Sequence, residues 1–199
     1  MPPIAPAGKP RLSTADLDIA ITAAGLDPAA EPLVVVGMRG YYRDTMGAPG
    51  VNDRGMYDDA IFLHTPSVTA AFNGNTDPSR TKKGRGRGTT QGMASLNAGV
   101  YRVHRFDKHN GKYLALCQRL GPVTVTRDGD PPYEDTGEFG INIHKGGYNG
   151  TSSLGCQTIH PDQWESFISL AVDQAKRYYG DRWNRVAIPY VLVDKTRDG

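Results

Sequence analysis

Long apolar runs are missing from this 199-residue sequence, and no stretch approaches the ~18 apolar residues that a membrane-spanning helix needs. The formal net charge is only +2, which argues against a nucleic-acid-binding protein because such proteins normally carry a larger basic excess. The amino terminus has no apolar segment after a basic start, so we expect no secretory signal peptide. The chain has two cysteines in different contexts, and we expect both thiols to be free.

Glycine and proline are abundant instead, with 24 and 14 residues, and they favour many turns and short strands over a helical bundle. An Asn110-Gly111 turn between two alternating segments is the clearest signal of a hairpin. Pro189 indicates an edge strand or a bulge. The predicted strands cover residues 32–38, 60–66, 67–74, 99–106, 112–120, 123–130, 139–144 and 185–193.

Two helices are predicted. Ser13 or Thr14 caps a short helix over residues 15–26, which Gly25 ends. A longer amphipathic helix runs from Pro161 to Gly180, where the apolar residues follow a helical period. The periodic positions are Trp164, Phe167, Ile168, Ala171, Ala175 and Tyr178. Together these elements predict a mainly β protein with α, of the α+β class.

The segment of residues 77–93 is glycine-rich and basic. Its composition is typical of a flexible, solvated loop, and a ligand-binding loop is the alternative. Residues 39–59 form a second turn-rich segment between predicted strands.

Cys156 stands out because it follows Ser153-x-Gly155 in an apparently exposed and flexible setting. A thiol is a weak nucleophile until a neighbouring base or positive charge activates it. His144 lies twelve residues earlier, and a glycine-rich segment of this length can fold back to bring its imidazole to the thiol. Gly155 would help the backbone N–H groups of residues 155 and 156 to face an oxyanion.

Each of these residues also has a structural interpretation. His144 alone would be read as a structural histidine at a strand end, and Cys117 as a small buried residue of a strand. The other histidines could supply zinc ligands together with His144, but no recognised metal spacing is present, and we expect neither a metal nor a cofactor. These histidines are His64, His104, His109 and His160.

The Ser153-x-Gly155-Cys156 motif, with His144 upstream, resembles the catalytic domain of L,D-transpeptidases, the YkuD-type fold. Residues 97–105 are similar to the family's Gly-x-Tyr strand, and the resemblance spans roughly residues 57–193. The chain departs from the family at Leu154, where most members have histidine, and at Thr158, where most have arginine or asparagine.

The resemblance implies a YkuD-like β-sandwich or barrel with one longer amphipathic helix after the catalytic cysteine. The catalytic domain would cover residues 57–199. Residues 1–56 would form an amino-terminal extension of a helix and a strand, packed on this core.

The implied activity is L,D-carboxypeptidase or L,D-transpeptidase action on peptidoglycan stem peptides. Cys156 would attack the carbonyl of the third residue, and His144 would accept the thiol proton. A backbone carbonyl of Lys145 or Gly146 would orient the imidazole. The expected substrate-binding residues are Ser153, Tyr148, Gly146 and Thr158, and a groove would be lined by Tyr148, Asn149 and residues 80–92.

Without a signal peptide, such an enzyme would be made in the cytoplasm and reach the cell wall or periplasm through delivery machinery or in a phage particle. A second hypothesis keeps the fold without the chemistry, as a wall-binding or phage structural module. A zinc hydrolase that uses His144 with other histidines is the third.

Overall fold

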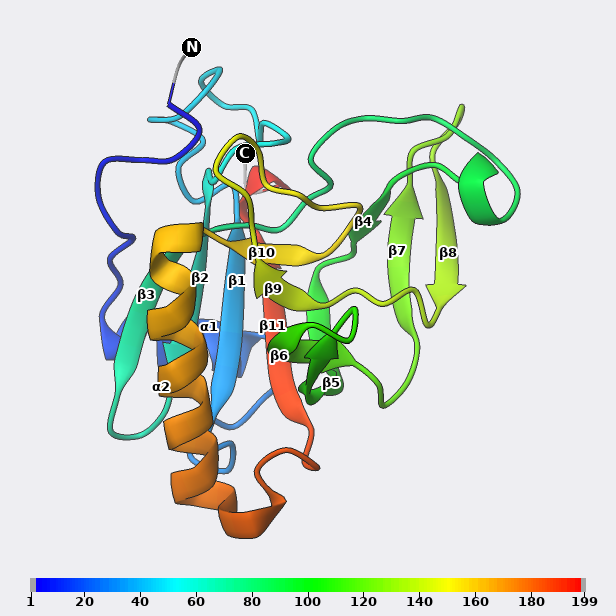
Figure 1. The fold of residues 1–199 in the computed structure, drawn as a ribbon. Coiled ribbons are helices and arrows are strands. Elements are labelled where there is room, and N and C mark those ends of the chain that lie inside the picture. Colours follow the sequence, from blue (N-terminus) through cyan, green and yellow to red (C-terminus); the bar gives the residue numbers. More distant parts are fainter. Residues whose placement is uncertain (1–2, 198–199) are drawn as a thin grey trace.

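A computed structural model describes residues 3–197, and most of its regular structure is β (Figure 1). Among these residues, eight strands close a barrel in the order β1-β11-β5-β6-β9-β10-β3-β2. The barrel strands are β1 (Val34–Arg39), β2 (Asp59–His64), β3 (Thr69–Asn75), β5 (Gly99–His109), β6 (Tyr113–Gln118), β9 (Ile143–Lys145), β10 (Gln157–Ile159) and β11 (Ile188–Asp194). The predicted mainly β class with one long helix is confirmed.

Local sequence signals explain the two long hairpins. β2 and β3 pair antiparallel around the turn at Thr65, and β5 and β6 pair around Asn110-Gly111. Asn110 and Gly111 both have positive φ, of 49° and 70°, as a tight hairpin turn requires. The expected bulge at Pro189 is also present, because the register between β11 and β5 shifts between Ile188 and Tyr190.

The long helix α2 (Pro161–Tyr179) begins with proline in its first turn and buries Trp164 and Phe167 in the main core. Its apolar stripe packs on the barrel, and Phe72 of β3 meets Phe167 edge to face, with ring centroids 5.3 Å apart. The short helix α1 (Thr14–Ala23) starts with a capping box between Ser13 and Asp16. No helix within residues 3–197 is long and apolar enough to cross a membrane.

The amino-terminal part of the chain contributes directly to the barrel. β1 lies between β11, to which it is parallel, and β2, to which it is antiparallel. Leu17 and Ile21 of α1 pack against apolar side chains of β1, β2 and β11 in a second core cluster.

The remaining three strands form a small antiparallel sheet, β4-β7-β8, beside the barrel (Figure 1). They are β4 (Ala94–Leu96), β7 (Val123–Arg127) and β8 (Tyr133–Gly137). The segment 77–93, with a short 3-10 turn η1 (Gly88–Thr90), is tied to the end of β7 through Asp128. The Asp128 carboxylate accepts from Lys82 N, and the Asp128 carbonyl accepts from Gly84 N. The expected free loop is therefore held against the small sheet.

Several boundaries differ from the sequence prediction. Of the strand predicted over 139–144, only residues 143 and 144 belong to β9. Before them, Ile141 N donates to the Gln118 side chain and Gln118 N donates to the Asn142 side chain, so these bonds to β6 are not backbone ladder bonds. β4, β8 and β10 were not predicted. β4, β9 and β10 have only three residues each, too few for a periodic pattern to be visible.

One end of the barrel encloses a buried charge cluster. Arg39 lies 3.3 Å from Asp77 and 3.6 Å from Asp194, and Asp59 accepts hydrogen bonds from Gly40 N and Thr76 N. Asp58 is 1% exposed, and its Oδ2 accepts from Asp53 N. Burial, aided by the neighbouring Asp59, raises the pKa of Asp58 to about 8.

This pKa shift predicts a measurable dependence of stability on pH. A carboxyl whose folded pKa exceeds its unfolded value stabilises the fold at low pH, and that stability is lost as the pH rises toward the folded value. The variant Asp58→Asn keeps an oxygen for Asp53 N but cannot ionise. Relative to the wild type, we expect it to gain about 1 kcal/mol or more between pH 5 and pH 8.5. Urea unfolding at both pH values measures the difference. Asp44→Asn, at an exposed side chain, is the control, and an equal gain there would contradict the prediction.

Candidate functional site

The loop that carries Cys156 is firmly held, although its composition suggested flexibility. Ser79 N donates to Ser153 O at 2.9 Å, and Ser153 N donates to the Ser79 hydroxyl at 2.7 Å. The same hydroxyl lies 2.7 Å from that of Thr151, which is fully buried. The cysteine is thus presented by a loop clamped to a distant segment of the chain.

Ser153 and Gly155 complete the local structure around the cysteine. The Ser153 hydroxyl donates to Cys156 O at 2.7 Å and accepts from Gly155 N at 3.0 Å. Gly155 has a φ of +149°, and a side chain there would collide with the carbonyl oxygen of Ala94. Of the two N–H groups expected to hold an oxyanion, that of Gly155 is therefore engaged. The N–H of Cys156 makes no hydrogen bond within residues 3–197.

Cys156 is a free cysteine and, taken as a whole residue, is partly exposed. Its sulfur lies 3.2 Å from Gly140 O, to which the S–H donates, and 3.4 Å from Asn142 N. Burial raises the pKa of this thiol to about 11, while the Asn142 N–H acts in the opposite direction. The sequence interpretation required a nearby base or a positive charge to activate this thiol. No cationic side chain of residues 3–197 contacts the sulfur, and at neutral pH the group is a thiol.

The pairing of two short parallel strands places His144 near this cysteine. In the β9–β10 register His144 lies opposite Thr158, two residues after Cys156. Thr158 and His144 therefore point to the same side of the two strands, and Cys156 directly precedes β10. Asn142, two residues before His144, contacts the Cys156 sulfur through its N–H. Thr158 itself is fully buried and cannot contact a substrate here, contrary to its expected binding role.

The imidazole of His144 is held in one orientation. Its Nδ1 lies 2.8 Å from Lys145 O, and this contact requires a proton on Nδ1. The expectation that a carbonyl of residue 145 or 146 orients the ring is therefore met by Lys145. Nε2 is left as the basic nitrogen, with no hydrogen bond to any described residue. Burial, with a further contribution from His109, lowers the pKa of His144 to about 4, so the ring is neutral at pH 7.

His109 of β5 stacks on His144, with ring centroids 4.1 Å apart and planes 19° from parallel. Asn142 determines which role His109 Nδ1 takes. Because Asn142 Oδ1 accepts from Gln118 N, the amide nitrogen of Asn142 donates to His109 Nδ1, at 3.0 Å. The hydroxyl of Tyr113 lies 3.5 Å from His144 Nδ1. These side chains pack around the imidazole and link it to Asn142, whose own N–H points at the Cys156 sulfur.

The thiol and the imidazole do not form a hydrogen bond with each other in this structure, because the S–H is directed to Gly140. Both groups are in neutral forms, and Asn142 links their surroundings. Its N–H contacts the sulfur, and its side chain bonds to the His109 ring that stacks on His144.

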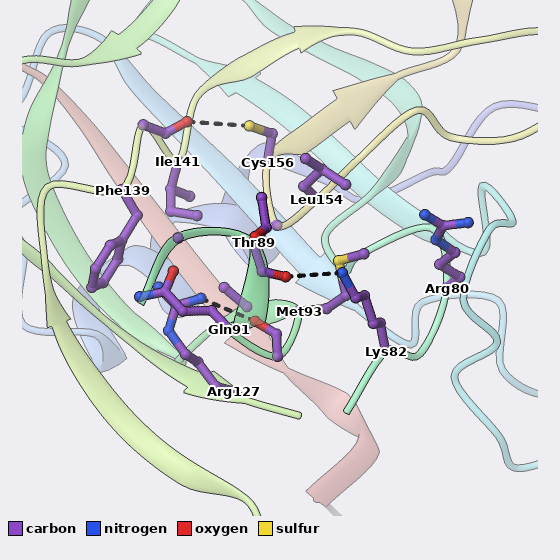
Figure 2. Close-up of a pocket in the computed structure, with 15 residues that line it drawn as sticks. Arg80, Lys82, Thr89, Gln91, Met93, Arg127, Phe139, Ile141, Leu154 and Cys156 are labelled. Atoms are coloured by element: carbon purple, nitrogen blue, oxygen red, sulfur yellow. Dashed lines mark hydrogen bonds between the residues drawn. The ribbon is translucent and has the colours of Figure 1, made fainter. Parts of the chain in front are cut away.

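A cavity of about 620 Å³ opens beside Cys156 (Figure 2). One wall comes from residues 139–141 and from Leu154, which is 70% exposed. The opposite wall is built by residues between 80 and 94, so part of the basic segment lines this cavity. Figure 2 shows Met93, Thr89 and Lys82 from this segment on the same cavity as Cys156. Arg127 completes the wall, bonded to Asp135 and lying over the Phe139 ring.

Three of the expected substrate-binding residues do not line the cavity. Tyr148 is 64% exposed and donates to Asp162 at the start of α2, and it does not line the cavity. Gly146 approaches Tyr57 so closely that any side chain would meet its hydroxyl. Ser153 is 3% exposed, so its hydroxyl supports the loop and does not reach the cavity.

The remaining histidines are dispersed. His64 bonds to Asp18, His104 to Ile141 O, and His160 accepts from Asp162 N at the start of α2. Within the described part of the chain, no three His, Cys, Asp or Glu side chains are arranged so that they could hold a metal ion.

Sequence reasoning missed the residues that support the site. Ser79 clamps the cysteine loop, Asn142 lies between the thiol and His109, and Gln118 and His104 fix residues 141–142 from neighbouring strands. Asn142 could have been found from its spacing, since it precedes His144 by two residues and shares its face. Ser79 gave no signal, because its partners are more than 70 residues away.

No protein-family model matches the sequence, and neither a curated protein nor a solved structure is significantly similar to it. The function is therefore argued from the chemistry of the site.

Proposed function

We propose that the protein is a cysteine-dependent L,D-carboxypeptidase or L,D-transpeptidase of peptidoglycan stem peptides, with Cys156 as nucleophile and His144 as base. The observation that supports the proposal is a thiol on the lining of a cavity of about 620 Å³. This thiol stands two residues before the β10 residue that pairs with His144, whose unbonded nitrogen is the basic one. The mainly β barrel with one long helix after the cysteine also accords with the YkuD-type fold that the sequence resembles.

The first half-reaction uses both neutral groups. Rotation of Cys156 about χ1 moves the sulfur from Gly140 O toward His144. Nε2 accepts the thiol proton as the sulfur attacks the carbonyl carbon of the third stem residue, and an S–C bond forms. The N–H of Cys156 is available to the oxyanion. The protonated imidazole then returns the proton to the departing amine, the C–N bond breaks, and a thioester remains on Cys156.

In the second half-reaction an acceptor attacks the thioester. Water gives the shortened stem peptide, and an amine gives a cross-link or an exchanged terminal residue. His144 takes the proton of the acceptor in the same way as that of the thiol. The cavity is open to solvent beside Leu154, and a site that admits water favours hydrolysis.

Such an enzyme acts on the cell wall, outside the cytoplasmic membrane. We propose delivery by a secretion machinery or release from a phage-infected cell as its route to this substrate. No membrane segment or cofactor enters the proposed reaction.

The direct test is incubation of the purified protein with disaccharide-tetrapeptide muropeptides, with and without an added D-amino acid. We expect mass spectrometry to show tripeptide products and free D-alanine, and an exchanged terminal residue if amines compete with water. Intact-protein mass spectrometry should detect a thioester adduct on Cys156 early in the reaction. A folded protein that leaves all tri-, tetra- and pentapeptide muropeptides unchanged would refute the proposal.

One observation favours a second candidate, a wall-binding or structural module without catalysis. The Cys156 S–H is bonded to Gly140 O, and the raised pKa keeps the thiol protonated. For this candidate the protein should sediment with insoluble peptidoglycan sacculi while leaving their muropeptide composition unchanged. Analysis of the muropeptides after incubation therefore separates the two functions, because only the enzyme changes their composition.

A further inference from the structure

The charge of the cavity beside Cys156 is one-sided. Its lining contains three cationic residues, Arg80, Lys82 and Arg127, and no acidic one. Arg127 is neutralised, because Asp135 lies 2.6 Å from its guanidinium and Gly92 O accepts a further hydrogen bond. It therefore forms part of the wall.

Arg80 and Lys82 have no such compensation. The Lys82 ammonium donates only to the carbonyl oxygen of Thr89, at 3.2 Å, and no carboxylate within residues 3–197 pairs with it. The Arg80 side chain is exposed and makes no ion pair or hydrogen bond with the described residues. Acidic side chains near this wall are already occupied: Asp128 by Arg54, and Asp130 by Lys83.

The backbone of this segment is fixed, so the two cations are presented from a defined position. Lys82 N donates to Asp128, and Met93 N donates to Lys82 O, which ties residue 82 to the strand that borders Cys156. Figure 2 shows Arg80 and Lys82 on the side of Leu154, away from Phe139 and Arg127.

We propose that Arg80 and Lys82 form a subsite for the free carboxylate of the terminal residue that Cys156 releases. This inference rests on the proposed function. An amino acid leaving from the end of a stem peptide carries a carboxylate a few bonds from the reacting carbonyl. Two uncompensated cations on the same cavity as the nucleophile match that group, because charge-assisted hydrogen bonds to a carboxylate are stronger than neutral ones. In this chain the subsite would replace an arginine after the cysteine, since the buried Thr158 stands at that position.

The test compares tetrapeptide substrates that end in a free carboxylate and in a carboxamide. For the double variant Arg80→Gln/Lys82→Gln we expect kcat/KM on the free acid to fall roughly tenfold or more. The rate on the carboxamide should change less than about twofold, so the preference for the acid collapses. Lys83→Gln is the matched control, because Lys83 is the adjacent cation but does not line the cavity.

A second readout needs no turnover. Binding of the tetrapeptide to Cys156→Ala, measured by calorimetry, should weaken with added salt, and the double substitution should remove most of this salt dependence. If the wild type converts neither substrate, the proposed function fails. If it converts both and the acid-to-amide ratio is unchanged in the double variant, only the subsite is overturned.

Discussion

Replacement of Cys156 by alanine should lower the release of D-alanine from tetrapeptide muropeptides roughly 10⁴-fold or more, because Cys156 carries the only thiol among the residues that line the cavity. The fold should persist. The sulfur makes only a weak S–H···O bond to Gly140 and one contact with Asn142 N, so the loss of stability should be about 1 kcal/mol. Muropeptide mass spectrometry measures the rate, and thermal unfolding verifies the fold.

The second thiol supplies the control. Cys117 is fully buried in β6, with its sulfur 3.6 Å from Asp107 O, and it does not line the cavity. Cys117→Ala should lose stability through the space it leaves and keep its catalytic rate within about twofold. Activity that survives in Cys156→Ala, or that disappears equally in a folded Cys117→Ala, would exclude the nucleophile proposed here.

Local signals predicted those parts of the fold that are determined within a few residues. The Asn110-Gly111 turn was visible because both positions need a positive φ, and α2 was visible because nineteen residues carry a helical period. β4, β9 and β10 have three residues each, and their existence depends on partners far away in the chain. Their boundaries could not be read from any local pattern.

In the candidate site, too, the features set by local sequence were predicted, and those set by distant residues were not. The motif indicated Cys156 and His144 as candidates, and the pairing of β9 with β10 sets His144 opposite Thr158, two residues after Cys156. The rigidity of the cysteine loop was misjudged, because its serines and glycines are typical of flexible segments, whereas Ser79 fixes them from more than 70 residues away. The pKa values of His144 and Cys156 could not be predicted from the sequence either. They depend on how deeply each group is buried, which is a property of the assembled barrel.

The position of the basic segment depends on hydrogen bonds to residues far away in the chain. Composition alone suggested a solvated loop over 77–93, but Asp128 accepts hydrogen bonds from Lys82 and Gly84 and holds the segment against β7, and Ser79 bonds to Ser153. These bonds make part of a polar segment the wall of a cavity. Nothing in the local composition distinguishes the two outcomes.

His144 should be nearly as important for turnover as the cysteine. His144→Gln removes the nitrogen that takes the thiol proton, and we expect kcat to fall roughly 10²- to 10⁴-fold. In the wild type the imidazole must be neutral to act as base. Because burial and His109 lower its pKa to about 4, activity should stay constant from neutral pH down to about pH 5, and then decline as the ring becomes protonated.

The variant His109→Gln isolates the contribution of the stacked ring. Glutamine retains a group that can bond to Asn142, but it carries no charge when the pH falls. His144 should then be protonated more easily, and the acid limb of the kcat–pH profile should move upward from about pH 4, toward the ordinary histidine value. Tyr113, whose hydroxyl lies 3.5 Å from His144 Nδ1, stays neutral in this range because burial raises its pKa. An acid limb that is unchanged in His109→Gln, or present in the residual activity of His144→Gln, would assign the titration to another group and remove His144 as the base.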